Sequence, residues 1–303
     1  MKGHALSYIT SSTQPTLGYF SPQDPFWRVN REWLVILSGA RAVIMELAHP
    51  LVAAGVANHS NFRRHSLGRL YRTIRMMIDA NFGSIETAHQ AVNRVHHCHR
   101  HVEGSLPEGI GPFAAETSYR ANDPVLKMWV LATLIDSTLL VHDLFVRPLT
   151  LAEKEAYYRD SQLLGGLLGI PAQVMPATYH DFSTYVEAMI NGDTLTVSDT
   201  AREVAEALFA PPLGPALRIA SFVGIGLLPA RLRADFNLPW DEQKEKRLHR
   251  LAALSRRVRP LLPTFICVQP EALIAEWRRQ QLGFVRKVTS TLNERSRAKE
   301  HRN

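Results

Sequence analysis

The sequence predicts an all-α fold, with a single multi-helix globular domain over residues 1–303. Three observations support this prediction. Apolar residues recur mainly at helical spacing, whereas strict alternation of apolar and polar residues is scarce. Residues that cap helices stand in front of most of these stretches. Hydrophobic residues make up 46% and charged residues 21% of the chain, which excludes a disordered protein.

The first elements are expected between Asp24 and Pro50. Asp24 can cap a helix whose first residue is Pro25, and the apolar spacing behind it continues to Gly39. A short helix over residues 41–48 should end before Pro50, because the residue preceding a proline is disfavoured in the α conformation. Pro50 can then open the next helix.

Further helices are expected over residues 67–80, 84–102 and 124–145, the last of them long and apolar. Later helix starts are predicted at side chains that can cap an N-terminus: Thr150 with Glu153, Thr178 with Asp181, Ser198 or Asp199, and Asp241. A last helix is expected to begin after Pro270. The C-terminal helices should fall within residues 199–290, and the basic tail, residues 294–303, should fray.

Charge and cysteine usage restrict the class of protein. The formal net charge of +7 is concentrated in the C-terminal third, and no nucleic-acid recognition motif accompanies it, so we expect no nucleic-acid partner. Cys98 and Cys267 form no metal or disulfide pattern and favour a reducing compartment. No signal peptide is recognised, and the apolar stretches at 127–136 and 218–231 are shorter than a membrane span. We therefore expect a soluble, cytoplasmic protein with no transmembrane segment, whose oligomeric state, homo-oligomer or monomer, the sequence leaves open.

Four histidines lie within six positions of the segment VHHCHRHVEG. On a helix, His96 and His99 share one face, and His97 and His101 share another. Imidazole is the usual protein ligand for haem iron and for zinc. Neighbouring valines place His99 on the apolar side, but spacing alone leaves His101 open as the ligand.

Arg69 and Thr73 lie upstream in the segment GRLYRT, one helical turn apart. A guanidinium and a hydroxyl that face the same way can together hold a carboxylate or a phosphate. The alternative is an exposed arginine beside a threonine that bonds to its own helix.

These segments, in this order, resemble the rubber-oxygenase (latex-clearing protein) and MpaB-type oxygenase family. The resemblance covers residues 38–185 and includes LAHPLVAAGVANHSNF, GRLYRT, HRHVEG and YRANDPVLKMWVLATL. It implies an all-α fold that encloses a haem pocket. It also implies a b-type haem with its iron, dioxygen as co-substrate, and a small apolar substrate of the lipid or isoprenoid kind.

The resemblance also implies roles for individual residues. His99 matches the histidine that ligates the haem iron, so it is the expected metal ligand. Arg69 and Thr73 match residues that help to hold the haem, and Arg72 stands where rubber-cleaving members carry a lysine on the distal side. Arg72 is therefore the candidate catalytic residue. The glutamate proposed as a catalytic base in those members has no counterpart between Leu51 and Asn58.

The sequence leaves open three alternatives to a haem-dependent oxygenase. The first is a haem carrier or sensor without turnover, which the missing glutamate favours. The second is a di-iron carboxylate oxidase, because Glu46-x-x-His49 and Glu86-x-x-His89 have the required spacing. The third is a helical protein without a cofactor. Hydrolases and nucleotide-dependent enzymes lack their sequence motifs here.

Overall fold

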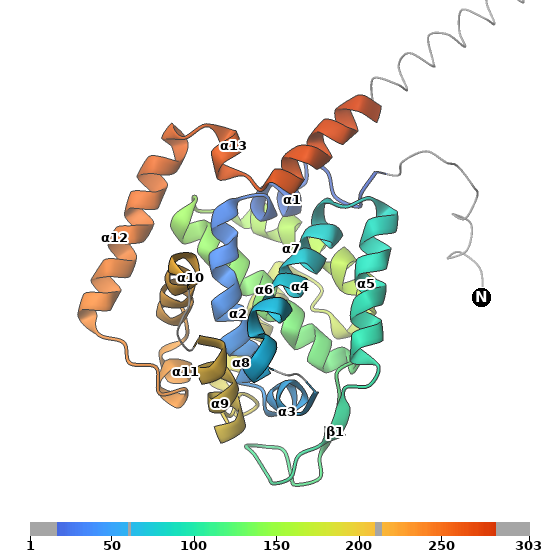
Figure 1. Ribbon diagram of the computed structural model, residues 1–303, viewed down its shortest axis with the longest axis vertical. Helices are drawn as coiled ribbons and strands as arrows, with labels where there is room; N and C mark the ends of the chain where they lie inside the picture. Colours follow the sequence, from blue (N-terminus) through green and yellow to red (C-terminus); the bar gives the residue numbers. More distant parts are fainter. Residues whose placement is uncertain (1–16, 60–61, 210–213, 283–303) are drawn as a thin grey trace, which may run out of the picture.

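The computed structural model describes residues 17–59, 62–209 and 214–282, and this part of the chain is all-α apart from one small sheet. Figure 1 shows the helices packed around a central one, α6. The helices are α1 (Pro25–Asn30), α2 (Ser38–Leu47), α3 (Pro50–His59), α4 (Phe62–Phe82), α5 (Ile85–His99), α6 (Pro124–Phe145), α7 (Leu151–Leu167), α8 (Tyr179–Asn191), α9 (Asp199–Phe209), α10 (Pro215–Gly226), α11 (Ala230–Asp235), α12 (Glu242–Val258) and α13 (Thr264–Cys267).

Shorter elements complete the fold. A last helix starts at Pro270 and continues to residue 282, where the described part ends. The 3₁₀ helices are η1 (Trp33–Leu37), η2 (Ala172–Val174) and η3 (Arg259–Leu261). Strands β1 (Glu103–Ser105) and β2 (Ser118–Arg120) pair antiparallel, with Gly104 opposite Tyr119.

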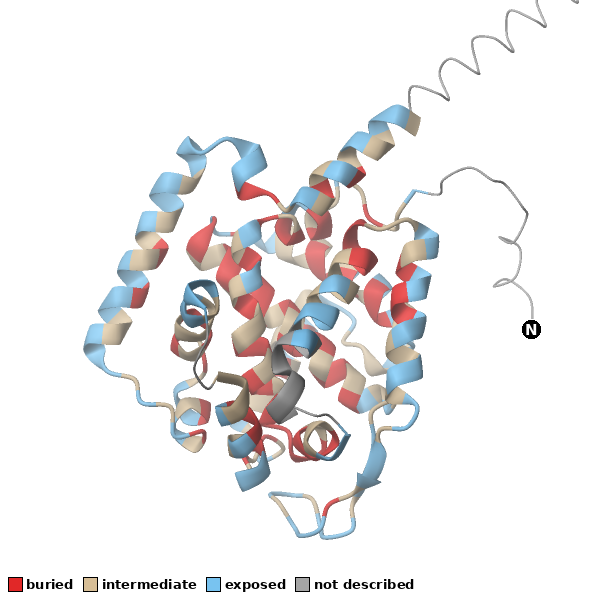
Figure 2. Cartoon of the chain, viewed as in Figure 1, coloured by how far each residue is buried: buried red, intermediate tan, exposed pale blue. Residues whose placement is uncertain are grey.

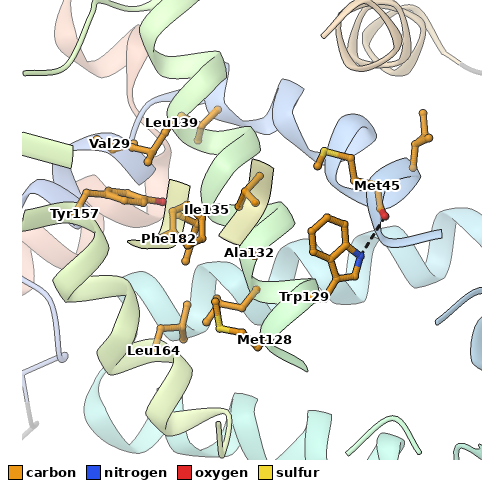
Figure 3. Close-up of a cluster of buried hydrophobic side chains, with 14 of the residues drawn as sticks. Val29, Met45, Met128, Trp129, Ala132, Ile135, Leu139, Tyr157, Leu164 and Phe182 are labelled. Atoms are coloured by element: carbon orange, nitrogen blue, oxygen red, sulfur yellow. Dashed lines mark hydrogen bonds between the residues drawn. The ribbon is translucent and has the colours of Figure 1, made fainter. Parts of the chain in front are cut away.

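The core lies along α6, which contacts α1, α2, α7, α8 and α12. Trp129, in the second turn of α6, is 1% exposed, and its indole Nε1 donates to the carbonyl oxygen of Met45 on α2 at 3.2 Å (Figure 3). Ile135 and Leu139 continue this buried surface toward Tyr157 of α7. One helix therefore supplies the surface on which most others pack.

The buried Arg41 connects α2 to α6 and to the end of α10 by an ion pair and hydrogen bonds. The guanidinium of Arg41 pairs with Asp136 at 2.7 Å, donates to the hydroxyl of Ser137 at 2.7 Å, and donates from Nε to the carbonyl of Leu227 at 2.9 Å. Arg41 is only 4% exposed, and these three partners compensate for the cost of burying its charge.

The predicted helix starts are confirmed where a side chain caps the helix. Thr150 with Glu153 and Thr178 with Asp181 both form complete capping boxes. Asp241 accepts from the backbone N–H of Lys244, as an N-cap should. These contacts are local, so the sequence alone could specify them.

The expected continuous helix from Pro25 to Gly39 was wrong. The chain leaves the helical conformation after Asn30, and Glu32 is extended with ψ 128°. The reason is tertiary: Glu32 forms a β-bridge with Val268, and the N–H of Gln269 donates to the carbonyl of Arg31 at 2.8 Å. Gly39 does not end a helix but lies inside α2.

The end of the helix predicted over residues 84–102 also differs from the expectation. It stops at His99 instead of residue 102, because the chain turns there to enter β1. The N–H of Ala121 donates to the carbonyl of Val102 at 2.8 Å and continues this pairing. The basic tail, residues 294–303, lies outside the described residues.

The expectation that no apolar stretch reaches the length of a membrane span was wrong for α6. The helix has 22 residues and includes Lys127 and Asp136, and its most apolar window has a mean hydropathy of 1.5. That window is 61% buried inside the protein. Core helices of soluble proteins have the same length and composition, so α6 alone is weak support for a membrane span.

Trp129→Ala should destabilise the protein by about 3–5 kcal/mol, because it leaves a cavity where α2 and α6 meet. Trp277→Ala is the matched control, since that side chain is 62% exposed, and it should change the free energy of unfolding by less than about 0.5 kcal/mol. Urea unfolding followed by circular dichroism measures both. Equal effects of the two substitutions would contradict the central role of α6.

Candidate functional site

The inward face of α5 carries the histidines that the sequence singled out. Ala88, Ala91 and Val92 are fully buried, and the same face continues one and two turns later through the half-buried His96 and His99. Helix α5 starts behind Ser84, whose hydroxyl accepts from the N–H of Thr87. This cap fixes which residues of α5 face inward.

His99 and His101 differ in their surroundings. His99 is the last residue of α5 and is half-buried, with its Nδ1 shielded from solvent. His97 and Cys98 are exposed on the other side of the helix, and His101 is exposed in the turn that follows. Of the two rings considered as ligand, His99 is the one that faces the interior. Its binding to iron stays a prediction.

His96 lies against the start of α6 and the end of α7. Gly169 follows α7 with φ 75°, and a Cβ there would lie 3.2 Å from Cε1 of His96. The Nζ of Lys127 donates to the carbonyl of Leu168 at 3.1 Å, and burial lowers its pKa although Asp123 opposes this. Sequence reasoning missed both contacts, and a single lysine within the apolar run of α6 was the only sign of them.

Helix α3 and the hairpin of β1 and β2 lie beyond His99, at the C-terminal end of α5. A Cβ at Gly55 would lie 3.5 Å from the side chain of Val102 and 3.6 Å from the ring of Tyr119. Asn58 donates to the hydroxyl of Tyr119 at 2.9 Å, and the Nε2 of His59 lies 3.0 Å from the carbonyl of Glu103. These contacts attach the hairpin to α3 directly beyond His99.

His49 lies beside a small apolar cluster at α3. It is 3% exposed, its Nδ1 accepts from the N–H of Leu51 at 3.3 Å, and its ring lies 5.3 Å from that of Phe113. Burial lowers the pKa of His49 to about 4, against smaller opposing contributions from a backbone hydrogen bond and Asp123. His49 is therefore neutral at pH 7.

The residues predicted on α4 lie at the surface. Arg72 and Thr73 are exposed, and the side chain of Arg69 lies outside the described residues. Helices α4 and α5 meet at the turn Gly83–Ser84 and diverge from it in Figure 1. His99 and Thr73 both lie well away from that turn.

Two cavities among the described residues lie elsewhere. One of about 230 Å³ is lined by residues of α1, α6, α7 and η3, and one of about 480 Å³ by residues of α7 and η2. Neither His99, Arg72 nor Thr73, the predicted site residues whose side chains are described, lines either cavity.

The di-iron alternative has no ligand cluster within the described ranges of the chain. Glu46 accepts from Thr133, Glu86 accepts from Gln90, and His89 bonds to the hydroxyl of Tyr19. No three His, Cys, Asp or Glu residues gather there in a metal-binding arrangement.

Comparison with known proteins decides the family. Residues 27–257 match the family described as "ER-bound oxygenase mpaB/B'/Rubber oxygenase, catalytic domain". The chain belongs to this oxygenase family. The match includes α2 to α6 and continues to the last turn of α12, so it extends well beyond the segments that carried the resemblance.

Two curated relatives are uncharacterized proteins of Mycobacterium bovis (strain ATCC BAA-935 / AF2122/97) and Mycobacterium tuberculosis (strain ATCC 25618 / H37Rv). Each is 28% identical over 238 residues, which cover 75% of this chain and 90% of the relative. No solved structure matches the chain significantly.

The chemistry of the side chains fits a haem. An axial imidazole needs a partly buried ring beside apolar side chains, which describes His99 on the face of Ala91 and Val92. Haem propionates stay near solvent, where an exposed hydroxyl such as that of Thr73 can donate a hydrogen bond to one of them.

Buried histidines should make the stability depend on pH. The pKa values of His49 and His142 are both lowered to about 4, so below pH 6.5 the unfolded state binds protons that the folded state does not. As the pH falls from 6.5 to 4, each of the two histidines should therefore lower the free energy of unfolding by about 1.4 kcal/mol for each pH unit. His49→Gln should reduce this slope, and the double variant with His142→Gln should reduce it further. Unchanged slopes in denaturant melts across this range would contradict the prediction.

Proposed function

We propose that this protein is a haem b-dependent oxygenase that acts on a small apolar substrate, lipid- or isoprenoid-like, with dioxygen in the cytoplasm. Membership of the oxygenase family supports the reaction class. The observation that carries the haem assignment is the position of His99, which ends the inward face of α5 with a solvent-shielded Nδ1.

In this proposal each of the predicted site residues has a separate role. His99 would hold the haem iron, and Arg69 and Thr73 on α4 would bind the haem propionates. The haem, when bound, supplies the iron that binds and activates dioxygen. Arg72 is the proposed catalytic group, since its cation next to Thr73 can stabilise negative charge that develops on oxygen.

The apolar character of the substrate is inferred from the side chains beside α3. Leu51, Ala54, Leu106, Tyr119 and Leu126 form a separate buried cluster. Neutral His49 adjoins it through Leu51 and Phe113. Such surroundings exclude water and favour a hydrocarbon over a charged substrate.

The second candidate is a haem carrier or sensor without turnover. The absence of the family glutamate between Leu51 and Asn58 favours it. The two functions differ in whether the bound haem would accept dioxygen. An oxygenase would need this, so the reduced protein should bind carbon monoxide and should consume dioxygen in the presence of an apolar probe such as squalene.

The haem assignment is tested by expressing the protein with haem supply and measuring a pyridine haemochrome. We expect about one haem b per chain. His99→Ala should lose most of it, because the axial ligand is gone, whereas His97→Ala and His101→Ala should retain it. These controls remove exposed imidazoles from the same segment.

Loss of haem only in His101→Ala would transfer the ligand role to that residue. A wild-type protein that binds no haem would overturn the proposal, and iron analysis would then test the di-iron alternative.

Arg72→Gln should leave the haem content unchanged and lower squalene-dependent oxygen uptake by at least about tenfold, because a neutral amide stabilises developing charge less well than a guanidinium. An oxygen electrode measures the uptake. Arg94→Gln is the control, since Arg94 is also exposed but pairs with Asp79 at 2.9 Å. Full activity of Arg72→Gln would remove Arg72 from the catalytic role.

A further inference from the structure

The surface between α12 and the last helix is unusually apolar. Among the described residues, seventeen large apolar side chains are exposed, and eight of them lie within residues 254–277. Figure 2 shows the pale blue of exposed residues along α12 and around α13. The eight are Leu254, Val258, Leu261, Leu262, Phe265, Ile266, Ile274 and Trp277. Clusters of this kind mark interaction surfaces.

The most exposed part is the connection from η3 into α13, residues 259–266, which we call the apolar tip. Leu261 is 81% and Phe265 67% exposed. Pro260 and Pro263 restrict the backbone on either side of Leu261. These side chains are therefore held in contact with water and do not pack into the core of the described residues.

The base of the apolar tip is firmly anchored. On one side Arg259 forms an ion pair with the buried Glu32. On the other side Cys267 and Val268 are buried, and Val268 bridges to Glu32. Fixed attachment on both sides distinguishes the tip from a frayed segment and orders it for binding.

The chain segment that leads into and through the apolar tip carries only positive formal charges. Residues 246–270 contain six Lys and Arg residues and no Asp or Glu. Lys246 pairs with Glu242 and Arg259 with Glu32, whereas within the described part of the chain Arg250, Arg256 and Arg257 are exposed and form no ion pair. The surface therefore offers both apolar side chains and unneutralised cations.

We propose that this surface docks the protein onto an anionic phospholipid bilayer. Leu261 and Phe265 insert among the acyl chains, and Arg256 and Arg257 contact the headgroup phosphates. Apolar side chains beside arginines are the combination that interfacial membrane binding requires, since neither contribution alone gives stable attachment.

A second copy of the chain fits this surface less well. A two-fold interface brings the same patch together from both subunits, so the cations of Arg256 and Arg257 from both copies would lie within one interface. Like charges at close range oppose such an interface, whereas an anionic bilayer attracts them. The proposal does not depend on the haem assignment, because α13 and the β1 end of α5 lie at opposite ends of the molecule in Figure 1.

The test is co-sedimentation of the purified protein with vesicles of phosphatidylcholine, alone or mixed with phosphatidylglycerol. The protein should bind the mixed vesicles more strongly, and added salt should weaken this binding. Leu261→Ser/Phe265→Ser should lower the partition coefficient by at least about tenfold, because two inserted side chains are lost. Arg256→Gln/Arg257→Gln should lower it by about tenfold and should reduce its dependence on salt.

The matched control is Val125→Ser/Leu163→Ser, which removes two exposed apolar side chains elsewhere and should leave binding unchanged. Circular dichroism melts verify that each variant is folded. Failure of the wild type to bind mixed vesicles, or binding that survives both tip and arginine variants, would overturn the proposal. A concentration-dependent dimer that Leu261→Ser/Phe265→Ser abolishes, without vesicle binding, would assign the surface to a second copy instead.

Discussion

The packing of α2 on α6 is the constraint on which the rest of the structure depends. Trp129 packs toward one end of this contact and donates to the carbonyl of Met45, while Arg41 connects the same two helices further along through its ion pair with Asp136. Because α6 is buried along most of its length, the helices around it can reach a common core only by packing against it. The positions of α1, α7, α8 and α12 follow from this one buried helix.

The same helix determines where the candidate site lies. Its first turns carry Lys127, whose bond to Leu168 holds the end of α7 beside His96. The inward face of α5 then presents His99 next to the hairpin that contacts α3. The proposed haem ligand thus depends on packing between several elements, whereas the proposed propionate partners are on the exposed side of α4. The proposed site would therefore extend from the apolar interior beside His99 to the basic surface of α4.

Prediction from sequence succeeded where the determining interactions are local. The capping boxes at Thr150 and Thr178 involve residues three positions apart, so the helix starts could be placed correctly. It failed at Glu32, where a bridge to Val268 from the far end of the chain ends a helix that the apolar spacing would continue. It also missed the hairpin, since three-residue strands are too short to show alternation.

The sequence by itself determined the all-α fold class, the oxygenase family and the set of histidines from which a ligand could come. Helical periodicity, capping residues and the order of the motifs can all be recognised in short segments of the chain. Only the tertiary structure decided which histidine faces inward, because His99 and His101 differ in burial only after α5 ends and the chain turns into β1. The apolar tip likewise became visible only in three dimensions: Leu261 and Val268 are both apolar in the sequence, and packing alone determines that one is 81% exposed and the other is buried.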